Sequence, residues 1–137
     1  MIDALSIALS GLRAHSTRLG VAANNIANAS TTGVLPTASS PSSTVYRPLS
    51  VSYVALTAGA GNSAGVSAQV TEDAQGYTPV YDPSSFYANE DGFIAAPNVD
   101  LMKEITDVLE SKLLYKANLA TIKTEREMSD ELLNVIT

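Results

Sequence analysis

The fold is decided by residues 2–28, which read IDALSIALSGLRAHSTRLGVAANNIAN. Apolar or small side chains recur there at alternating spacings of three and four residues, at Ile2, Leu5, Leu9, Leu12, Ser16, Leu19, Ala23 and Ile26. This spacing predicts one long helix with a narrow apolar stripe, in which Ser16 is the polar exception. Such a helix spans roughly 40 Å at about 1.5 Å per residue, so a solitary helix would leave its stripe exposed. The stripe therefore needs a partner.

A polar cluster follows and predicts where this helix ends. Asn24, Asn25 and Asn28 carry amides that can bond to nearby backbone groups, and Gly33 tolerates a positive φ. We therefore expect the helix to stop at Gly33, and we assign residues 1–33 to an N-terminal region.

Residues 98–137 predict a second long helix. Pro97 and Asn98 supply a rigid entry and a candidate N-cap. Apolar side chains then recur on helical steps, at Leu101, Ile105, Val108, Tyr115, Leu119, Ile122, Leu133 and Ile136, with Lys112, Arg126 and Ser129 interrupting the stripe. Unbroken, this helix would span roughly 57 Å. Both ends of the chain are thus expected to be long helices.

Residues 34–97 lie between the helices and predict a Ser-rich linker followed by a β-rich insert. Nine Ser or Thr residues and two Pro residues fall within residues 30–44, a composition too polar to bury much surface. Residues 49–56 and 66–71 alternate apolar and polar side chains, as strands do, and residues 77–81 add a short edge strand. The predicted fold class is α+β: two terminal helices paired as a coiled-coil-like rod, with a small β-rich insert.

The composition excludes several functions. The chain has 14 acidic and 8 basic residues, one His, no Cys and a net charge of −6. This charge argues against a nucleic-acid partner, because affinity for the phosphate backbone comes mainly from Lys and Arg. Without Cys, and with a single His, no disulfide, metal site or cofactor site is expected. No apolar run approaches the roughly 20 residues that a membrane span needs.

Catalytic residues are not expected either. His15 lies beside the N-terminal stripe with no acid or nucleophile predicted near it, and the carboxylates are scattered. A small enzyme with a carboxylate site remains an alternative, which would require a buried acid of raised pKa in a pocket. A free helical adaptor that binds one partner through the same stripe is another alternative.

One short motif resembles part of a calcium-binding loop. Asn89, Asp91 and Gly92 fit three of its positions, but Tyr87 and Asn98 would occupy positions that need acidic ligands. We interpret the segment as a turn.

The run Val21–Ala29 followed by Thr31-Thr32-Gly33 resembles the N-terminal signature of the bacterial flagellar rod and hook proteins. Further matches to that family are Tyr46-Arg47-Pro48, Val80-Tyr81-Asp82-Pro83, Gly92-Phe93-Ile94, Pro97-Asn98-Val99-Asp100, and Tyr115, Ala117, Asn118 and Lys123 on the last helix. The short length resembles the proximal rod members, of which there are two, and the matches at residues 97–100 and Tyr115 favour one of them. The Ser-rich residues 37–44 depart from the family pattern.

The resemblance implies a structural role. Members of this family are exported through the flagellar type III apparatus without a cleaved leader. They assemble helically, with copies of themselves and with other rod proteins, into a rod that crosses the periplasm and transmits torque. The terminal helices would pair in the inner tube, and the insert would pack outside between subunits. The sequence agrees on the leader, because the apolar stretch before Ala27-Asn28-Ala29 is too short for a signal peptide.

We therefore predict assembly through the two helices. The predicted interface consists of Leu5, Leu9, Leu12, Leu19 and Ile26 packing on Ile105, Val108, Tyr115, Leu119 and Ile122, together with the amides of Asn24, Asn25, Asn28 and Asn118.

Overall fold

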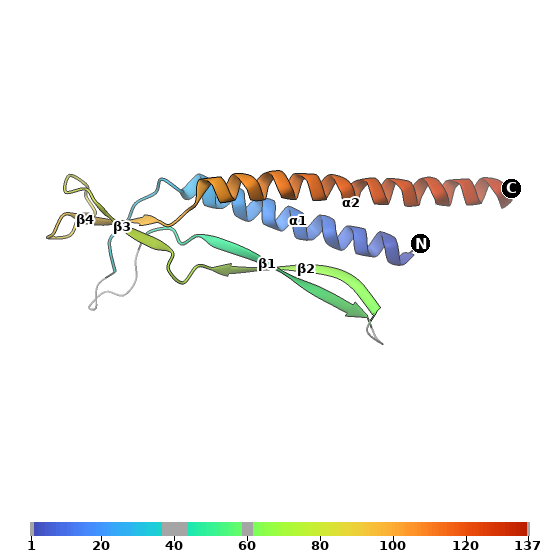
Figure 1. Ribbon diagram of the computed structural model, residues 1–137, viewed down its shortest axis with the longest axis horizontal. Coiled ribbons are helices and arrows are strands. Elements are labelled where there is room, and N and C mark those ends of the chain that lie inside the picture. The colour runs from blue at the N-terminus through green and yellow to red at the C-terminus, as the bar shows by residue number, and fades with distance from the viewer. Residues whose placement is uncertain (1, 37–43, 59–61, 137) are drawn as a thin grey trace. The chain divides into compact units, whose positions relative to one another are not determined.

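The computed structural model describes residues 2–36, 44–58 and 62–136 (Figure 1). The elements, in chain order, are α1 (Ile2–Asn28), β1 (Leu49–Ala58), β2 (Asn62–Glu72), β3 (Tyr77–Tyr81), β4 (Phe93–Pro97) and α2 (Leu101–Ile136). Two long terminal helices with a small β insert confirm the predicted α+β class. The linker prediction falls largely on residues 37–43, and these, like residues 59–61, lie outside the described residues.

The contacts divide the chain into two compact units. Unit 1 comprises Met1–Gly20, Val51–Gln69 and Thr106–Thr137, and unit 2 comprises Val21–Ser50 and Val70–Ile105. Each unit therefore draws on residues from the N-terminal helix, the insert and the C-terminal helix.

Helix α1 ends at Asn28, five residues before the predicted stop. The Asn28 amide donates to the carbonyl of Asn24 at 2.9 Å, and the Thr31 hydroxyl donates to the carbonyl of Asn28 at 2.8 Å. Gly33 was therefore the wrong stop, since it exchanges two backbone hydrogen bonds of 2.9 Å with Ala95. A Cβ on Gly33 would lie 2.6 Å from the Val45 nitrogen, so a close backbone approach is the reason for glycine here.

Helix α2 begins with a cap at Asp100 rather than at Asn98. The Asp100 carboxylate accepts hydrogen bonds from the backbone nitrogens of Met102 at 3.0 Å and Lys103 at 3.1 Å. The predicted cap at Asn98 is therefore wrong by two residues; its backbone nitrogen instead donates to the carbonyl of Gly76 at 3.1 Å. A carboxylate satisfies the orphan N–H groups and also complements the helix dipole.

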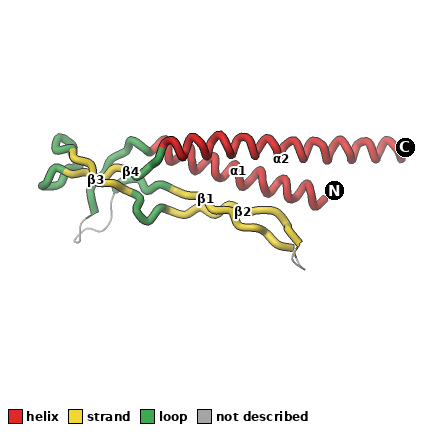
Figure 2. The backbone as a smooth tube through the Cα atoms, in the orientation of Figure 1, coloured by secondary structure: helices red, strands yellow, loops and turns green. Residues whose placement is uncertain are grey.

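The strands form two small sheets, coloured yellow in Figure 2. β1 pairs with β2, and β3 pairs antiparallel with β4, with Tyr77 opposite Pro97 and Tyr81 opposite Phe93. β4 was not predicted, because its sequence FIAAP lacks an apolar–polar alternation. The predicted turn before it is confirmed: the Asn89 side chain accepts hydrogen bonds from the backbone nitrogens of Asp91 and Phe93, and Gly92 has φ of 81°.

Small and polar residues dominate the buried positions. Among the described residues, the buried apolar side chains are Ala8, Leu12 and Ala14 in unit 1 and Ala22, Val45, Ile94 and Ala95 in unit 2, where Pro48 and Pro97 are buried as well. The largest fully buried side chains are Asn25 and Ser111, which are both polar. Apolar burial within one chain is therefore slight.

The cap at Asp100 can be tested by substitution. Asp100→Ala should lower the free energy of unfolding by about 1 kcal/mol, because two backbone N–H groups lose their acceptor. Asn98→Ala serves as the matched control and should change it by less than about 0.5 kcal/mol. Urea unfolding followed by circular dichroism measures both, and equal effects of the two substitutions would contradict the assignment.

Candidate assembly surface

The side chain of Asn25 is the centre of unit 2. It is 0% exposed, and its amide nitrogen donates to the Leu49 carbonyl at 2.8 Å and to Oε1 of Glu104 at 3.0 Å. Its oxygen accepts from the Leu49 nitrogen at 2.9 Å and from the Tyr46 hydroxyl at 2.8 Å. The amide has two donors and two acceptor lone pairs, so its whole hydrogen-bonding capacity is used. One side chain thereby joins α1, the start of β1 and α2.

The groups around Asn25 are matched to it electrostatically. Glu104 is buried, and its Oε1 also lies 3.6 Å from the Lys103 ammonium. Burial, and then the negative charge of Glu104, raise the pKa of Tyr46. The Tyr46 hydroxyl therefore stays protonated at neutral pH and can donate to Asn25.

In unit 1 the two helices approach closely. A Cβ on Gly11 would lie 2.8 Å from Oδ1 of Asn118, so a larger side chain at Gly11 would require the Asn118 side chain of α2 to move. Seven residues later on α1, the Arg18 guanidinium contacts Asp107 at 2.6 Å and Glu110 at 3.1 Å. The contact later in α1 has its partners earlier in α2. The two helices therefore run antiparallel, as Figure 1 also shows.

These contacts define what we call the helix seam. It consists of Gly11 and Arg18 with their partners Asn118, Asp107 and Glu110 in unit 1, and of Asn25 with Glu104 in unit 2. Every member is a glycine or a polar residue. Close approach, hydrogen bonds and ion pairs therefore contribute to the interaction between the helices of one chain.

The β1–β2 sheet is attached to the helices of unit 1 by aromatic and polar contacts. The Tyr53 hydroxyl lies 3.3 Å from Nδ1 of His15, and the Arg18 guanidinium lies 5.8 Å from the centre of the Tyr53 ring. Burial, and then the Arg18 charge, lower the pKa of His15, although Glu110 opposes this shift. His15 is therefore mainly neutral at pH 7, which suits its contact with Tyr53.

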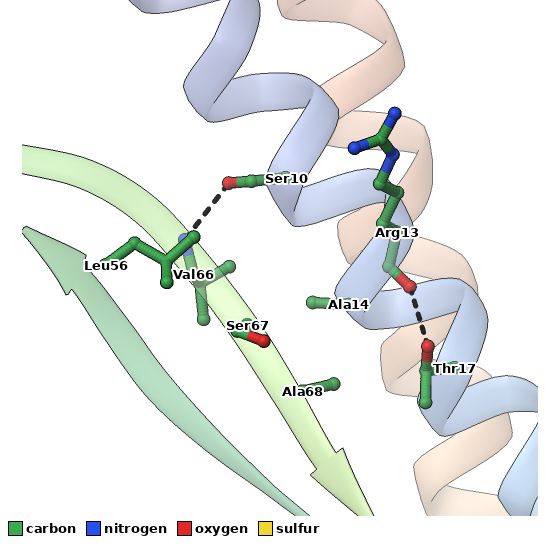
Figure 3. Close-up of a pocket in the computed structure, with 8 residues that line it drawn as sticks. All are labelled: Ser10, Arg13, Ala14, Thr17, Leu56, Val66, Ser67 and Ala68. Carbon is green, nitrogen blue, oxygen red and sulfur yellow. Dashed lines mark hydrogen bonds between the residues drawn. The ribbon is translucent and has the colours of Figure 1, made fainter.

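A second attachment lies beside a cavity of ≈240 Å³, drawn in Figure 3. The Ser10 hydroxyl accepts from the backbone nitrogen of Val66 at 3.0 Å and donates to the carbonyl of Ile7 at 2.7 Å. Gly65 has φ of 116° and lies against Ser10, so a side chain there would be strained and would collide. Ala14, Leu56 and Ala68 line the cavity, and no catalytic constellation is visible among its labelled residues.

The predicted apolar interface residues lie mostly at the surface of the single chain. Seven of them, Leu5, Leu9, Leu19, Ile26, Ile105, Tyr115 and Leu119, are between 37% and 50% exposed. Leu12 is buried, and Val108 and Ile122 are half-buried. Leu19 lines one groove together with Val108, Tyr115 and Leu119.

The predicted amides have different environments. Asn25 is buried, Asn28 and Asn118 are half-buried, and Asn24 is exposed. Periodicity did not predict the contacts of Tyr46, Arg18, Asp107 and Glu104 or the burial of Ser111. A second helical stripe of small residues, Ala4, Ala8 and Gly11, was the available signal for the close approach of α2.

Two further features were sought in the part of the chain that the structure describes, namely groups of metal ligands and helices long and apolar enough to span a membrane. Within residues 2–36, 44–58 and 62–136, no group of three or more His, Asp or Glu side chains is placed to hold a metal ion. None of the described helices has the length and apolarity needed to cross a membrane.

The importance of the Asn25 amide can be measured. Asn25→Ala should lower the free energy of unfolding by about 3 kcal/mol or more, because several buried groups lose their partner. Asn24→Ala, one residue away, is the matched control: its exposed side chain accepts from Asn28 and should cost less than about 1 kcal/mol. Urea unfolding of the two variants compares them, and similar losses would refute the role of Asn25.

Two family models match the ends of the chain. The family model described as "Flagella basal body rod protein" matches residues 5–33. A second, "Flagellar basal body rod FlgEFG protein C-terminal", matches residues 90–135. The two matches fall on α1 with its polar end, and on β4 with nearly all of α2.

Curated relatives match along most of their length. The flagellar basal-body rod protein FlgC of Salmonella typhimurium is 33% identical over 130 residues, which cover 93% of this chain and 92% of the relative. FlgC of Bacillus subtilis is 28% identical over 143 residues, covering 96% and 95%. The chain therefore belongs to the FlgC family of flagellar basal-body rod proteins.

Proposed function

We propose that this chain is a structural subunit of the proximal flagellar rod, where it assembles helically with copies of itself and with other rod proteins and transmits torque across the periplasm. Membership of a rod protein family, which is structural rather than enzymatic, supports the role in the basal body. The helical assembly, the proximal position and the partners are the parts that we add.

The observation that carries the proposal is the exposure of large apolar side chains on both helices. Each buried Å² of apolar surface contributes roughly 25 cal/mol, yet the chain leaves Leu5, Leu9 and Leu119 between 41% and 50% exposed. The helix seam already joins α1 to α2 without them. These side chains are therefore available to neighbouring subunits, and contacts between unlike surfaces that do not close generate helical assemblies.

The role of α1 supports export without a cleaved leader. The triplet Ala27-Asn28-Ala29, which resembles a signal-peptidase site, lies at the end of α1. Cleavage there would remove Asn25 and with it the hydrogen bonds that join the three segments of unit 2. We therefore propose export of the intact chain by the flagellar type III apparatus. We also propose that the β insert packs on the outside, between subunits.

Leu9 provides the sharpest test of assembly. Leu9→Asp should abolish rod formation and swimming, because a charge buried between subunits costs several kcal/mol. The purified variant should unfold within about 0.5 kcal/mol of the unaltered chain, since Leu9 is 41% exposed in it. Leu12, which is buried within the chain, would not separate folding from assembly.

The measurement is complementation of a strain that lacks this gene, read by swimming in soft agar and by electron microscopy of basal bodies. Leu9→Met is the matched control and should restore both. Normal rods in a strain that produces only the Leu9→Asp chain would contradict the proposal.

A further inference from the structure

Two adjoining hollows along α2 form one apolar groove in unit 1. The first, of ≈500 Å³, is lined by Leu19 of α1 and by Val108, Tyr115 and Leu119 of α2. The second, of ≈480 Å³, continues along α2 over Leu119 and Ile122. Because Lys116 and Leu119 line both hollows, the groove runs without interruption along this side of α2.

The rim of this groove is basic. Lys112, Lys116, Lys123 and Arg126 line it, and none of the described lining residues is acidic. Lys123 lies 3.7 Å from Glu127, but both side chains are more than half exposed, so this pair contributes little. The occupant that fits such a groove is an apolar segment with acidic flanks.

The last residues of α2 have that chemistry. Met128, Leu132 and Val135 are exposed, Val135 to 84%, and residues 127–136 contain Glu127, Asp130 and Glu131 but no basic residue. This segment and the groove are therefore both apolar, and their charges are opposite in sign.

In the register of the two helices, no described residue of α1 lies opposite this segment. Gly11 contacts Asn118, and the helices are antiparallel, so Ile2 lies opposite Glu127. Figure 1 shows α2 continuing past the N-terminal end of α1. Within the described residues, 128–136 therefore extend beyond α1 as an overhang of about 13 Å.

We propose that the overhang of one copy, residues 128–136, binds in the basic-rimmed groove of a second copy. The groove follows α2 from Val108 to Arg126, roughly 27 Å, which is longer than the overhang. The overhang cannot fold back into its own groove, because both belong to one continuous helix. The contact joins two different surfaces, so it can repeat from copy to copy and extend an assembly.

This inference rests on the proposed function and adds the surfaces through which copies meet. It is tested by cross-linking, for which a chain without cysteine is well suited. Leu119→Cys in the groove is combined with Val135→Cys in the overhang. Sixteen residues of helix hold these positions about 24 Å apart within one chain. A disulfide requires Cα atoms within about 7 Å, so a bond between positions 119 and 135 must join two copies.

Rods are isolated from cells that produce the doubly substituted chain and are then oxidised mildly. We expect a ladder of covalent oligomers that disappears on reduction. The control pairs Val135→Cys with Leu113→Cys, a 67% exposed position of α2 that lines neither hollow, and should give no ladder. Assembled rods without a ladder above this control would overturn the inference while leaving the proposed function intact.

Charge reversal provides a second test that does not depend on the cysteine variants assembling. The pair Lys116→Glu and Lys123→Glu makes the groove acidic, and the pair Asp130→Lys and Glu131→Lys makes the overhang basic. Either chain alone would place like charges in contact, so we expect loss of swimming. Cells that produce both chains can alternate them with every contact complementary, and swimming should return. Normal swimming with either chain alone, or failure of the two together, would overturn the inference.

Discussion

The amide of Asn25 is the interaction on which unit 2 depends. It bonds to both backbone groups of Leu49, to the Tyr46 hydroxyl and to the Glu104 carboxylate. An aspartate at this position would accept hydrogen bonds but could not donate to the Leu49 carbonyl or to Glu104, and an apolar residue would leave all of these groups unsatisfied. The joining of helix, strand and helix is thus specified by one side chain whose donors and acceptors are all engaged.

The helix seam extends the same constraint along the chain. A buried amide, a glycine contact and the Arg18 ion pair join α1 to α2, and the Asn118 side chain occupies the space that a side chain at Gly11 would take. Many of the large apolar residues, Leu5, Leu9 and Leu119 among them, stay exposed in the single chain. Polar, directional contacts therefore help to hold the helices of one chain together, and the exposed apolar side chains leave a non-directional hydrophobic contribution for contacts between chains.

The sequence predicted what depends on near neighbours. Each helix is predicted by the spacing of apolar residues within its own segment. The partners of Asn25 lie 21 to 79 residues away along the chain, and the spacing of residues does not predict contacts over such separations. Periodicity also marks the stripe with the largest side chains, and in α1 that is not the stripe nearest α2. Asn98 and Asp100 are both good capping residues. The bond from the Asn98 nitrogen to Gly76, a tertiary contact, distinguishes them.

A polar seam has a further consequence for a protein that repeats in an assembly. A shift of α1 along α2 by one turn, about 5.4 Å, would break the hydrogen bond between the Asn25 amide and Glu104. The same shift would move Gly11 away from Asn118 and place a larger side chain against it. The register of α1 on α2 is therefore fixed within each chain. Each copy then presents the same groove and the same overhang, and a register error cannot accumulate from one subunit to the next.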